Sequence, residues 1–340
     1  MNILAIETSC DETSVAVVNA INGKFTILSN IVSSQIKIHR KYGGIVPEVA
    51  ARNHAKNIIP VFEKAIKKAQ AGKTKIDYIA VANKPGLITS LLVGVETAKA
   101  VSYVWQKPLL AVDHVKAHLY ANWFSSAADY QMSVVRFPSL GLIVSGGHTQ
   151  LIYMKDAFSF KIVGETLDDA AGEAFDKVAK ILGLGYPGGP VISRMADFGD
   201  ENKFQFPLGL LHSGDFNFSF SGIKTSVLYL TKRLDKRIIE RQRADICAGF
   251  QKAVVDVLVK KTYAASKKFK TETILLGGGV TANRKLREEM QKKSLAENIK
   301  VLIPPVGLCT DNAAIIAAAA YFKVRKKQFS HWSKIKVESN

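Results

Sequence analysis

The sequence predicts an α/β protein built from two lobes of related design. Segments typical of strands alternate with segments typical of helices, which favours α/β lobes with mixed sheets. Two segments, Leu4–Val18 and Leu140–Tyr153, each have the pattern of an apolar strand, a tight polar turn and a second apolar strand. Because each hairpin opens one half of the chain, we expect a duplicated fold: lobe I of residues 1–125 and 305–340, and lobe II of residues 126–304.

The length of 340 residues fits roughly two domains or one large one, and an apolar share of 47% can supply a core. The longest apolar stretches, such as Ile315–Phe322, are too short to span a bilayer. The first residues resemble a strand and carry no targeting signal, so we expect a cytosolic location. Cys10, Cys247 and Cys309 are far apart in sequence, which fits a reducing compartment and favours small turn residues over a catalytic thiol.

The net charge of +18 favours an acidic polymer as partner, and nucleic acid over a small acidic metabolite. No zinc-finger or RRM signature accompanies this charge. The basic residues gather in four clusters: Lys64, Lys67, Lys68, Lys73 and Lys75; Lys232, Arg233, Lys236, Arg237, Arg241 and Arg243; Arg284, Lys285, Arg287, Lys292 and Lys293; Lys323, Arg325, Lys326 and Lys327.

Apolar periodicity and helix start and stop signals predict the remaining elements. The helices are expected at Pro85–Trp105, Asp113–Phe124, Thr166–Leu182, Glu240–Phe269 and Thr310–Lys327. Thr166 is the expected N-cap of the third of these helices. That helix would carry Asp169, Glu173 and Asp176 on one face, either to bind ribose hydroxyls or a cation, or as a solvated face paired with lysines.

Glycines follow the predicted strand Thr273–Leu276. Gly277, Gly278 and Gly279 allow close approach of the backbone to a ligand, and the basic helix after Asn283 has an N-terminus that favours anions. A triple glycine is also compatible with a simple strand-to-helix turn.

His114 and His118 are the strongest chemical signal. Four residues apart, they project from one face of the predicted helix, and imidazole suits zinc or iron. Asp311 stands at the predicted start of a distant helix and offers a third, carboxylate ligand that would leave coordination positions open. The alternative is a pair of packed or solvated histidines without a metal.

Eight motifs, in order along the chain, resemble the TsaD family of tRNA N6-adenosine threonylcarbamoyltransferases, and the Tyr42–Glu48 segment is similar to its bacterial or organellar branch. They are Ile6–Thr13, Tyr42–Glu48, His114–His118, Val144–Thr149, Asp168–Lys177, Tyr186–Pro190, Phe218–Thr225 and Cys309–Asn312. The resemblance implies an actin/hexokinase/Hsp70-like (ASKHA) fold with a nucleotide in the cleft between duplicated lobes. It also implies transfer of threonylcarbamoyl from L-threonylcarbamoyl-AMP to the adenosine 3′ of the anticodon in tRNAs that read codons beginning with A.

The resemblance also implies residue roles. His114, His118 and Asp311 would bind one divalent metal, iron or zinc. The turn residues Glu7, Asp11 and Glu12 would face the reacting groups, with Asp11 helping to take the proton from the attacking amine. The adenylate would contact a further set of residues: Ile143, Val144, Ser145, Gly146, Gly147, Asp176, Gly189 and Asn283. The implied partners are tRNA, a TsaB-like paralogous subunit and a TsaE-like ATPase, and a homodimer is the other expected arrangement.

Two departures from the family pattern are small: Lys84 replaces a usual glycine, and Lys116 replaces a usual acid. Three other functions compete. A metalloprotease of the H-E-x-x-H type needs a glutamate where this chain has Val115. A sugar kinase or ATPase of the same fold class would not need the histidine pair. A non-catalytic scaffold would be expected to lack the metal motif.

Overall fold

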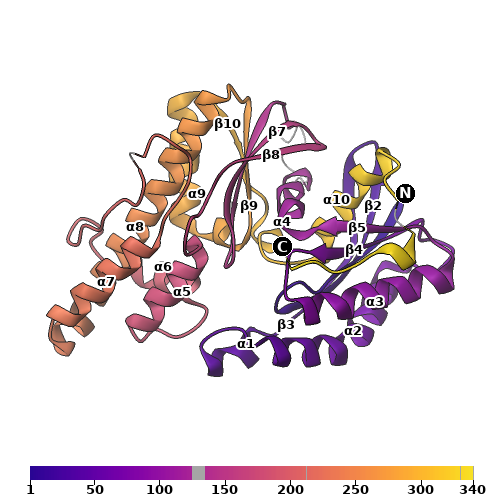
Figure 1. Cartoon of the computed structure of the whole chain (residues 1–340), viewed down its shortest axis with the longest axis horizontal. Coiled ribbons are helices and arrows are strands. Elements are labelled where there is room, and N and C mark those ends of the chain that lie inside the picture. The colour runs from indigo at the N-terminus through magenta and orange to yellow at the C-terminus, as the bar shows by residue number, and fades with distance from the viewer. Residues whose placement is uncertain (125–134, 212, 330, 340) are drawn as a thin grey trace. The chain divides into compact units, whose positions relative to one another are not determined.

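The computed structural model describes residues 1–124, 135–211, 213–329 and 331–339 (Figure 1). The chain divides into two compact units. Unit 1 comprises Met1–Val134 and Pro304–Asn340, and unit 2 comprises Val135–Ile303. None of the helices among the described residues combines the length and the apolar character that a membrane span requires.

Unit 1 is built on a five-stranded sheet with the order β3-β2-β1-β4-β5. The first three strands pair antiparallel, whereas β4 and β5 run parallel to β1. The elements are β1 (Asn2–Glu7), β2 (Glu12–Ile21), β3 (Lys24–Ser34), α1 (Ile36–His39), η1 (Arg40–Tyr42), α2 (Pro47–Ala69), β4 (Tyr78–Lys84), α3 (Ile88–Trp105), β5 (Leu109–Asp113), α4 (His114–Ala117), η2 (His118–Trp123), η4 (Val306–Leu308), α10 (Ala313–Arg325) and η5 (Trp332–Lys334).

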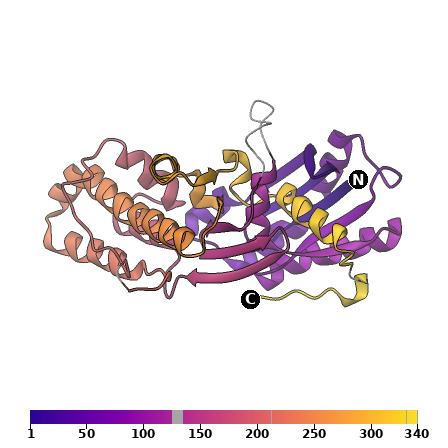
Figure 2. The same ribbon diagram turned by 90° about the horizontal axis from the view of Figure 1, so that it is seen from above.

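Helices α2 and α3 contact the sheet of unit 1, and so does α10, which packs across β1 and β2 and is yellow in Figure 2. The strand β1 has the sequence Asn-Ile-Leu-Ala-Ile-Glu, and its apolar side chains Ile3, Leu4 and Ile6 are fully buried. A continuous apolar run of this kind is what a strand covered on both faces requires. The C-terminal segment thus completes the unit that the N-terminus begins.

Unit 2 repeats this plan with the order β10-β9-β6-β7-β8. Strands β6, β7 and β8 pair antiparallel, whereas β9 and β10 continue the sheet in parallel. The elements are β6 (Ser139–Val144), β7 (Thr149–Asp156), β8 (Ser159–Glu165), α5 (Ala171–Ile181), α6 (Gly188–Ala196), α7 (Ser221–Arg233), α8 (Lys236–Lys268), β9 (Thr273–Gly277), η3 (Gly279–Ala282), α9 (Arg284–Glu297) and β10 (Lys300–Leu302). Both predicted hairpins and the mixed α/β sheets are confirmed.

Several helix boundaries differ from the prediction for local reasons. The long helix α8 begins at Lys236, before the expected Glu240, because the Asp235 carboxylate accepts the N–H of Arg237 and caps it. The last major helix begins at Ala313, because Asn312 is its N-cap. The predicted helix over 113–124 is a four-residue α-helix followed by a 3₁₀ segment.

The predicted N-cap Thr166 is wrong. Thr166 forms a bridge with Phe218, and its hydroxyl donates to the Asp169 carbonyl across a bend at residues 167–169, so α5 begins only at Ala171. Asp169 therefore precedes the helix. Its carboxylate pairs with Lys177 at 2.5 Å and Lys224 at 2.7 Å, as the paired-lysine alternative anticipates.

Candidate metal centre and glycine-rich turns

The end of β5 places the two histidines. Strand β5 ends at Asp113, and the Asp113 carboxylate accepts the N–H of Lys116 at 3.0 Å, which starts a helical turn at once. His114 is the first residue of α4, and His118 follows one turn later at the beginning of η2. One helical turn is enough to direct both rings to the same side, although the continuous helix expected from the sequence is not present.

Asp311 comes to the histidines from the C-terminal segment. The next residue, Asn312, caps α10: its side-chain oxygen accepts the N–H groups of Ala314 at 3.1 Å and Ile315 at 3.3 Å. The hydroxyl of Ser14 on β2 accepts the N–H of Ala313 at 2.9 Å, which ties the start of the helix to the sheet. Since α10 also packs against α4 and η2, the position of Asp311 is fixed from both sides.

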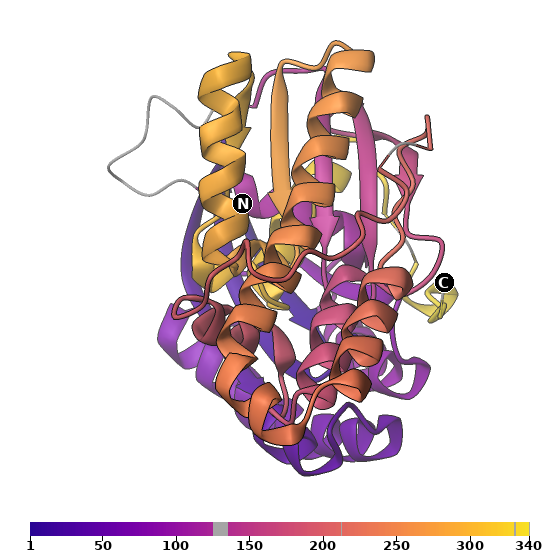
Figure 3. The ribbon, with the colours of Figure 1, turned by 90° about the vertical axis from the view of Figure 1, so that its left-hand side faces the viewer.

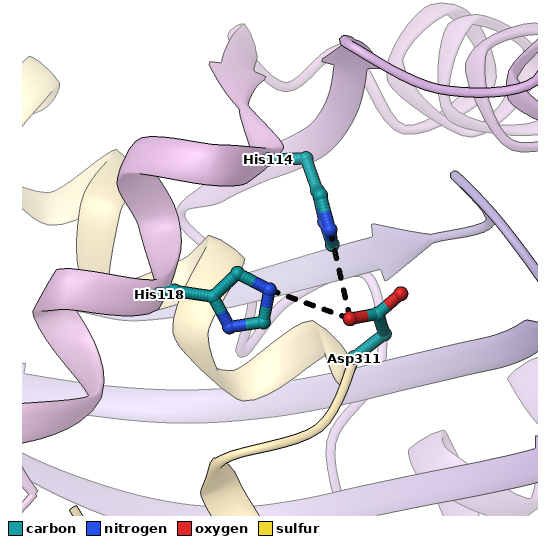
Figure 4. Close-up of side chains that lie close together, drawn as sticks. All are labelled: His114, His118 and Asp311. Carbon is teal, nitrogen blue, oxygen red and sulfur yellow. Dashed lines mark ion pairs between the residues drawn. The ribbon is translucent and has the colours of Figure 1, made fainter. Parts of the chain in front are cut away.

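Figure 4 shows both imidazoles directed at one oxygen of the Asp311 carboxylate. The Asp311 Oδ1 atom lies 3.6 Å from His114 Nε2 and 3.3 Å from His118 Nε2. The three ligand atoms lie within 4.8 Å of one another, and the two histidines are buried. This group can hold a metal ion, and its nitrogen and oxygen donors suit zinc or iron.

Glu7 lies behind His114. Its Oε2 accepts a hydrogen bond from His114 Nδ1 at 2.8 Å, and its Oε1 accepts the N–H of Ser9 at 2.5 Å. Glu7 is fully buried. A carboxylate on the far nitrogen of a histidine fixes the ring orientation and makes the near nitrogen a better metal ligand. The pairing with Glu7 therefore leaves His114 Nε2 directed at Asp311.

The burial and hydrogen bonding of His118 show whether a metal ion fits this site. The residue is 1% exposed, and within the described part of the chain neither of its ring nitrogens forms a hydrogen bond. A buried polar atom without a partner is costly, unless a ligand absent from the protein itself supplies one. A metal ion bound at Nε2 is such a ligand, so the residues present fit a metal.

The charges around the histidines also favour a cation. Burial opposes protonation of His114, but the carboxylates of Glu7 and Asp311 outweigh it and raise the pKa of His114 to about 9. The same carboxylates would stabilise a bound metal ion in place of the proton.

The turn between β1 and β2 carries further buried acids. Asp11 is 7% and Glu12 is 9% exposed, and Glu12 accepts a hydrogen bond from Ser34 at 3.0 Å. Burial, together with the charges of Asp11 and Asp311, raises the pKa of Glu12 well above its usual range. Burial likewise raises the pKa of the Cys10 thiol, and this agrees with its interpretation as a turn residue.

His54 on α2 holds this turn and was missed in the sequence. Its Nε2 donates to the Cys10 carbonyl at 3.0 Å, while its Nδ1 pairs with the Thr13 hydroxyl at 2.8 Å. Burial lowers the pKa of His54, which keeps the ring neutral and suited to this pattern. The available signal was a histidine between the buried positions Ala50 and Ile58 of the amphipathic helix.

In unit 2, Ile143 and Val144 end β6 and are fully buried, so their side chains serve the sheet. The turn that follows is closed by the Ser145 N–H, which donates to the His148 carbonyl at 2.8 Å. Gly146 and Gly147 at its tip are exposed, and an added Cβ at either would meet no atom within 4 Å.

The glycine turn after β9 lies against the same strand end. Gly278 has φ +92°, and a Cβ there would lie 2.4 Å from the Val144 carbonyl oxygen. A Cβ on Gly172, in the first turn of α5, would lie 2.5 Å from the Ser145 carbonyl oxygen. These contacts bring the β6–β7 turn, the glycine turn and the start of α5 together.

Two of the last three predicted contacts, Asp176 and Asn283, have structural roles in the chain. Asp176 accepts the N–H of Gly188 at 2.6 Å, at the start of α6. Gly189 has open space where a Cβ would stand. The oxygen of Asn283 accepts the Leu286 N–H at 3.0 Å as the N-cap of α9, and its amide donates to Gln251 at 2.7 Å.

Comparison with known proteins assigns the family. A family model described as TsaD, tRNA N6-adenosine threonylcarbamoyltransferase, matches residues 26–318. The protein of that name from Thermosipho africanus is 51% identical over 340 residues, which cover 100% of this chain and 99% of the relative. The one from Bacillus subtilis is 48% identical over 327 residues, which cover 96% and 91%.

Solved structures confirm the fold. Component A of (R)-2-hydroxyglutaryl-CoA dehydratase from Acidaminococcus fermentans matches with a TM-score of 0.54 and 13% identity, over 96% of this chain and 99% of that one. HypF from T. kodakarensis matches with a TM-score of 0.62 and 14% identity, over 99% of this chain and 50% of that one. These likenesses support the ASKHA-type fold, and the sequence relatives support the activity. The chain belongs to the TsaD family, the transferases that attach threonylcarbamoyl to adenosine in tRNA.

Proposed function

We propose that the donor in this reaction is L-threonylcarbamoyl-AMP and that the acceptor is N6 of the adenosine 3′ of the anticodon in tRNAs reading codons that begin with A. AMP is the leaving group. The observation that carries the proposal is the histidine–carboxylate group with Glu7 behind His114, in a chain of this family.

His114, His118 and Asp311 are the proposed ligands of one divalent metal, iron or zinc. A buried His118 without hydrogen bonds supports this assignment. Bound there, the metal would supply Lewis-acid stabilisation of negative charge on the carbonyl oxygen of the donor. Glu7 is then a positioning residue, because it acts on the metal site through His114.

Asp11 is the proposed acceptor of the proton that leaves the attacking amine. Burial, together with the charges of Asp11 and Asp311, raises the pKa of Glu12 well above its usual range, and the Glu12 carboxyl already accepts the Ser34 hydroxyl. We therefore assign Glu12 to holding the turn through Ser34 and Asp11 to the proton transfer.

The adenylate is proposed to bind unit 2 through Ser145, Gly146 and Gly147, with Ile143 and Val144 supporting the turn from the sheet. Exposed glycines without neighbours at the Cβ position allow backbone N–H groups to approach phosphate oxygens. Asp176, Gly189 and Asn283 are proposed to contact the ribose and base. Because Asn283 is already the N-cap of α9, we expect it to act mainly by fixing the helix N-terminus, which favours anions.

The test is transfer of radiolabelled threonylcarbamoyl from its adenylate to unmodified tRNA, with wild type compared to His114→Ala. A TsaB-like subunit and a TsaE-like ATPase are the proposed partners, so the assay is run with and without them. Label in tRNA that depends on His114 is the expected result. Hydrolysis of ATP without tRNA and no label from folded, metal-loaded protein would instead favour a kinase-like activity.

A further inference from the structure

A cavity in unit 2 has no part in the proposed metal or adenylate sites. Its volume is about 570 Å³, and α7 and the segment around Phe204–Phe206 line it. A volume of this size is within the range of sites that enclose a small organic ligand or one nucleotide. Neither the metal centre nor the glycine-rich turns contribute a lining residue.

The walls of the cavity combine aromatic rings with hydrogen-bonding groups. Phe204, Phe206 and Tyr229 supply rings, and Tyr229 is 57% exposed. The hydroxyl groups of Thr225 and Tyr229 form no hydrogen bond within the described residues, so they remain available to a ligand. Flat apolar rings beside free polar groups match an unstacked nucleobase, which offers a π-face and a polar edge.

Arg233 lines the cavity and belongs to a basic cluster that continues into α8. Figure 3 shows α8 in orange, and the contacts place it beside α7. The cluster consists of Lys232, Arg233, Lys236, Arg237, Arg241 and Arg243. Among the described residues, none of these six cations pairs with a carboxylate. Two acids, Asp235 and Glu240, lie in the same stretch and leave a net charge of +4.

The basic cluster of α9 differs in this respect. Arg284 pairs with Asp197 at 2.5 Å, Lys285 with Glu201 at 3.0 Å and Lys293 with Glu297 at 2.9 Å. Neutralised cations attract a polyanion less than unpaired ones. The α7–α8 cluster therefore offers several phosphate contacts in a row, more than one free nucleotide can use.

We infer that this cavity is a second contact site for RNA, which holds an unstacked nucleobase against Tyr229 and the phenylalanines while Arg233 and its neighbours bind the adjoining phosphates. The base is one other than the adenosine that is modified. The inference depends on the family activity in one respect: it takes tRNA to be a substrate of this protein.

The test compares the affinity of variants for unmodified tRNA in filter binding at fixed salt. Tyr229→Ala is expected to weaken binding about 5- to 150-fold, the usual effect of losing one stacked base. Tyr229→Phe keeps the ring and should bind nearly as wild type. Phe198→Ala is the matched control, because Phe198 is 85% exposed and does not line the cavity.

The charge is tested in the same way. Arg233→Ala should weaken binding more than Lys232→Ala, which removes the same charge from a residue outside the cavity. The steady-state transfer assay should show a larger rise in the KM for tRNA than fall in kcat for Tyr229→Ala.

Equal tRNA affinity of wild type and Tyr229→Ala, with both folded by circular dichroism, would overturn the inference. So would AMP binding that depends on Tyr229 while tRNA binding does not, since the cavity would then be a mononucleotide site. Tyr229-dependent tRNA binding without any threonylcarbamoyl transfer would leave the inference standing and count against the proposed chemistry.

Discussion

The two units begin with the same antiparallel arrangement of three strands, but their first turns differ. In unit 1 the turn after β1 carries acids and is buried, and Glu7 at its start is hydrogen-bonded to His114. In unit 2 the turn after β6 carries Gly146 and Gly147, which are exposed. One sheet plan thus supports two kinds of site: fixed, charged side chains suited to a cation, and an open backbone suited to an anionic ligand.

The largest expected effect comes from disrupting the proposed metal centre of unit 1. His118→Ala removes a proposed ligand, so the metal content of purified protein should fall to near zero, and transfer should drop by at least about 100-fold. Metal analysis and the labelled transfer assay measure this. The control is His331→Ala, an exposed histidine of unit 1. One metal per chain in His118→Ala would contradict the assignment.

The second-largest effect comes from changing the glycine-rich turns of unit 2. In Gly278→Ala the new Cβ would meet the Val144 carbonyl in a left-handed backbone conformation, so we expect a loss of about 1–3 kcal/mol of stability. Gly147→Ala has open space and should keep the melting temperature while raising the KM for the adenylate. An unchanged KM in folded Gly147→Ala would argue against close approach of the ligand to this turn.

A smaller effect separates positioning from ligation. Glu7→Gln keeps a hydrogen-bond acceptor for His114 but removes the charge, so metal affinity should fall about 10-fold, with the metal still bound at high concentration. Titration with a competing chelator measures the affinity. Glu12→Gln is the control, because Glu12 lies in the same turn but pairs with Ser34, whereas Glu7 pairs with His114. Equal losses in both variants would show that the effect is general to the acidic turn.

The smallest effect concerns stability in unit 2. Burial alone would raise the pKa of Asp169, but Lys177 and Lys224 outweigh it and hold the pKa below its usual value. Asp169 therefore stabilises the fold above the pKa of the unfolded chain, near 4, and this contribution is lost as the pH falls through the lower folded pKa. Asp169→Asn should cost about 1–2 kcal/mol at pH 7. Urea unfolding should show that the stability difference between wild type and Asp169→Asn narrows below about pH 4. A stability difference that does not change with pH would contradict this role of Asp169.

Much of this architecture was predictable from the sequence. The twin hairpins follow from strand periodicity and polar turns, and the sequence alone predicts His114, His118 and Asp311 as one group of ligands. Their convergence depends on α10 packing beside α4, a long-range contact that no local pattern encodes. The eight family motifs supplied what local patterns could not.

Other features can be recognised only in the folded structure. Thr166 has the composition of an N-cap, but pairing with Phe218 keeps it in an extended segment, and this tertiary contact overrides the local preference. Glu7 was expected among the reacting groups, and only its distance of 2.8 Å from His114 Nδ1 indicates a positioning role. A single histidine in an amphipathic helix is a weak signal, so the sequence alone does not assign a role to His54.

The discontinuous composition of unit 1 has a consequence for biosynthesis. Asp311 is encoded near the end of the chain, and it stands beside histidines made almost 200 residues earlier. At a synthesis rate of about 5–20 residues per second, the ribosome would make His118 roughly 10–40 seconds before Asp311. During that interval unit 2 can be completed, whereas the group of three side chains cannot. A nascent or truncated chain that ends before Asp311 would lack one of the three proposed ligands and could not assemble the complete centre.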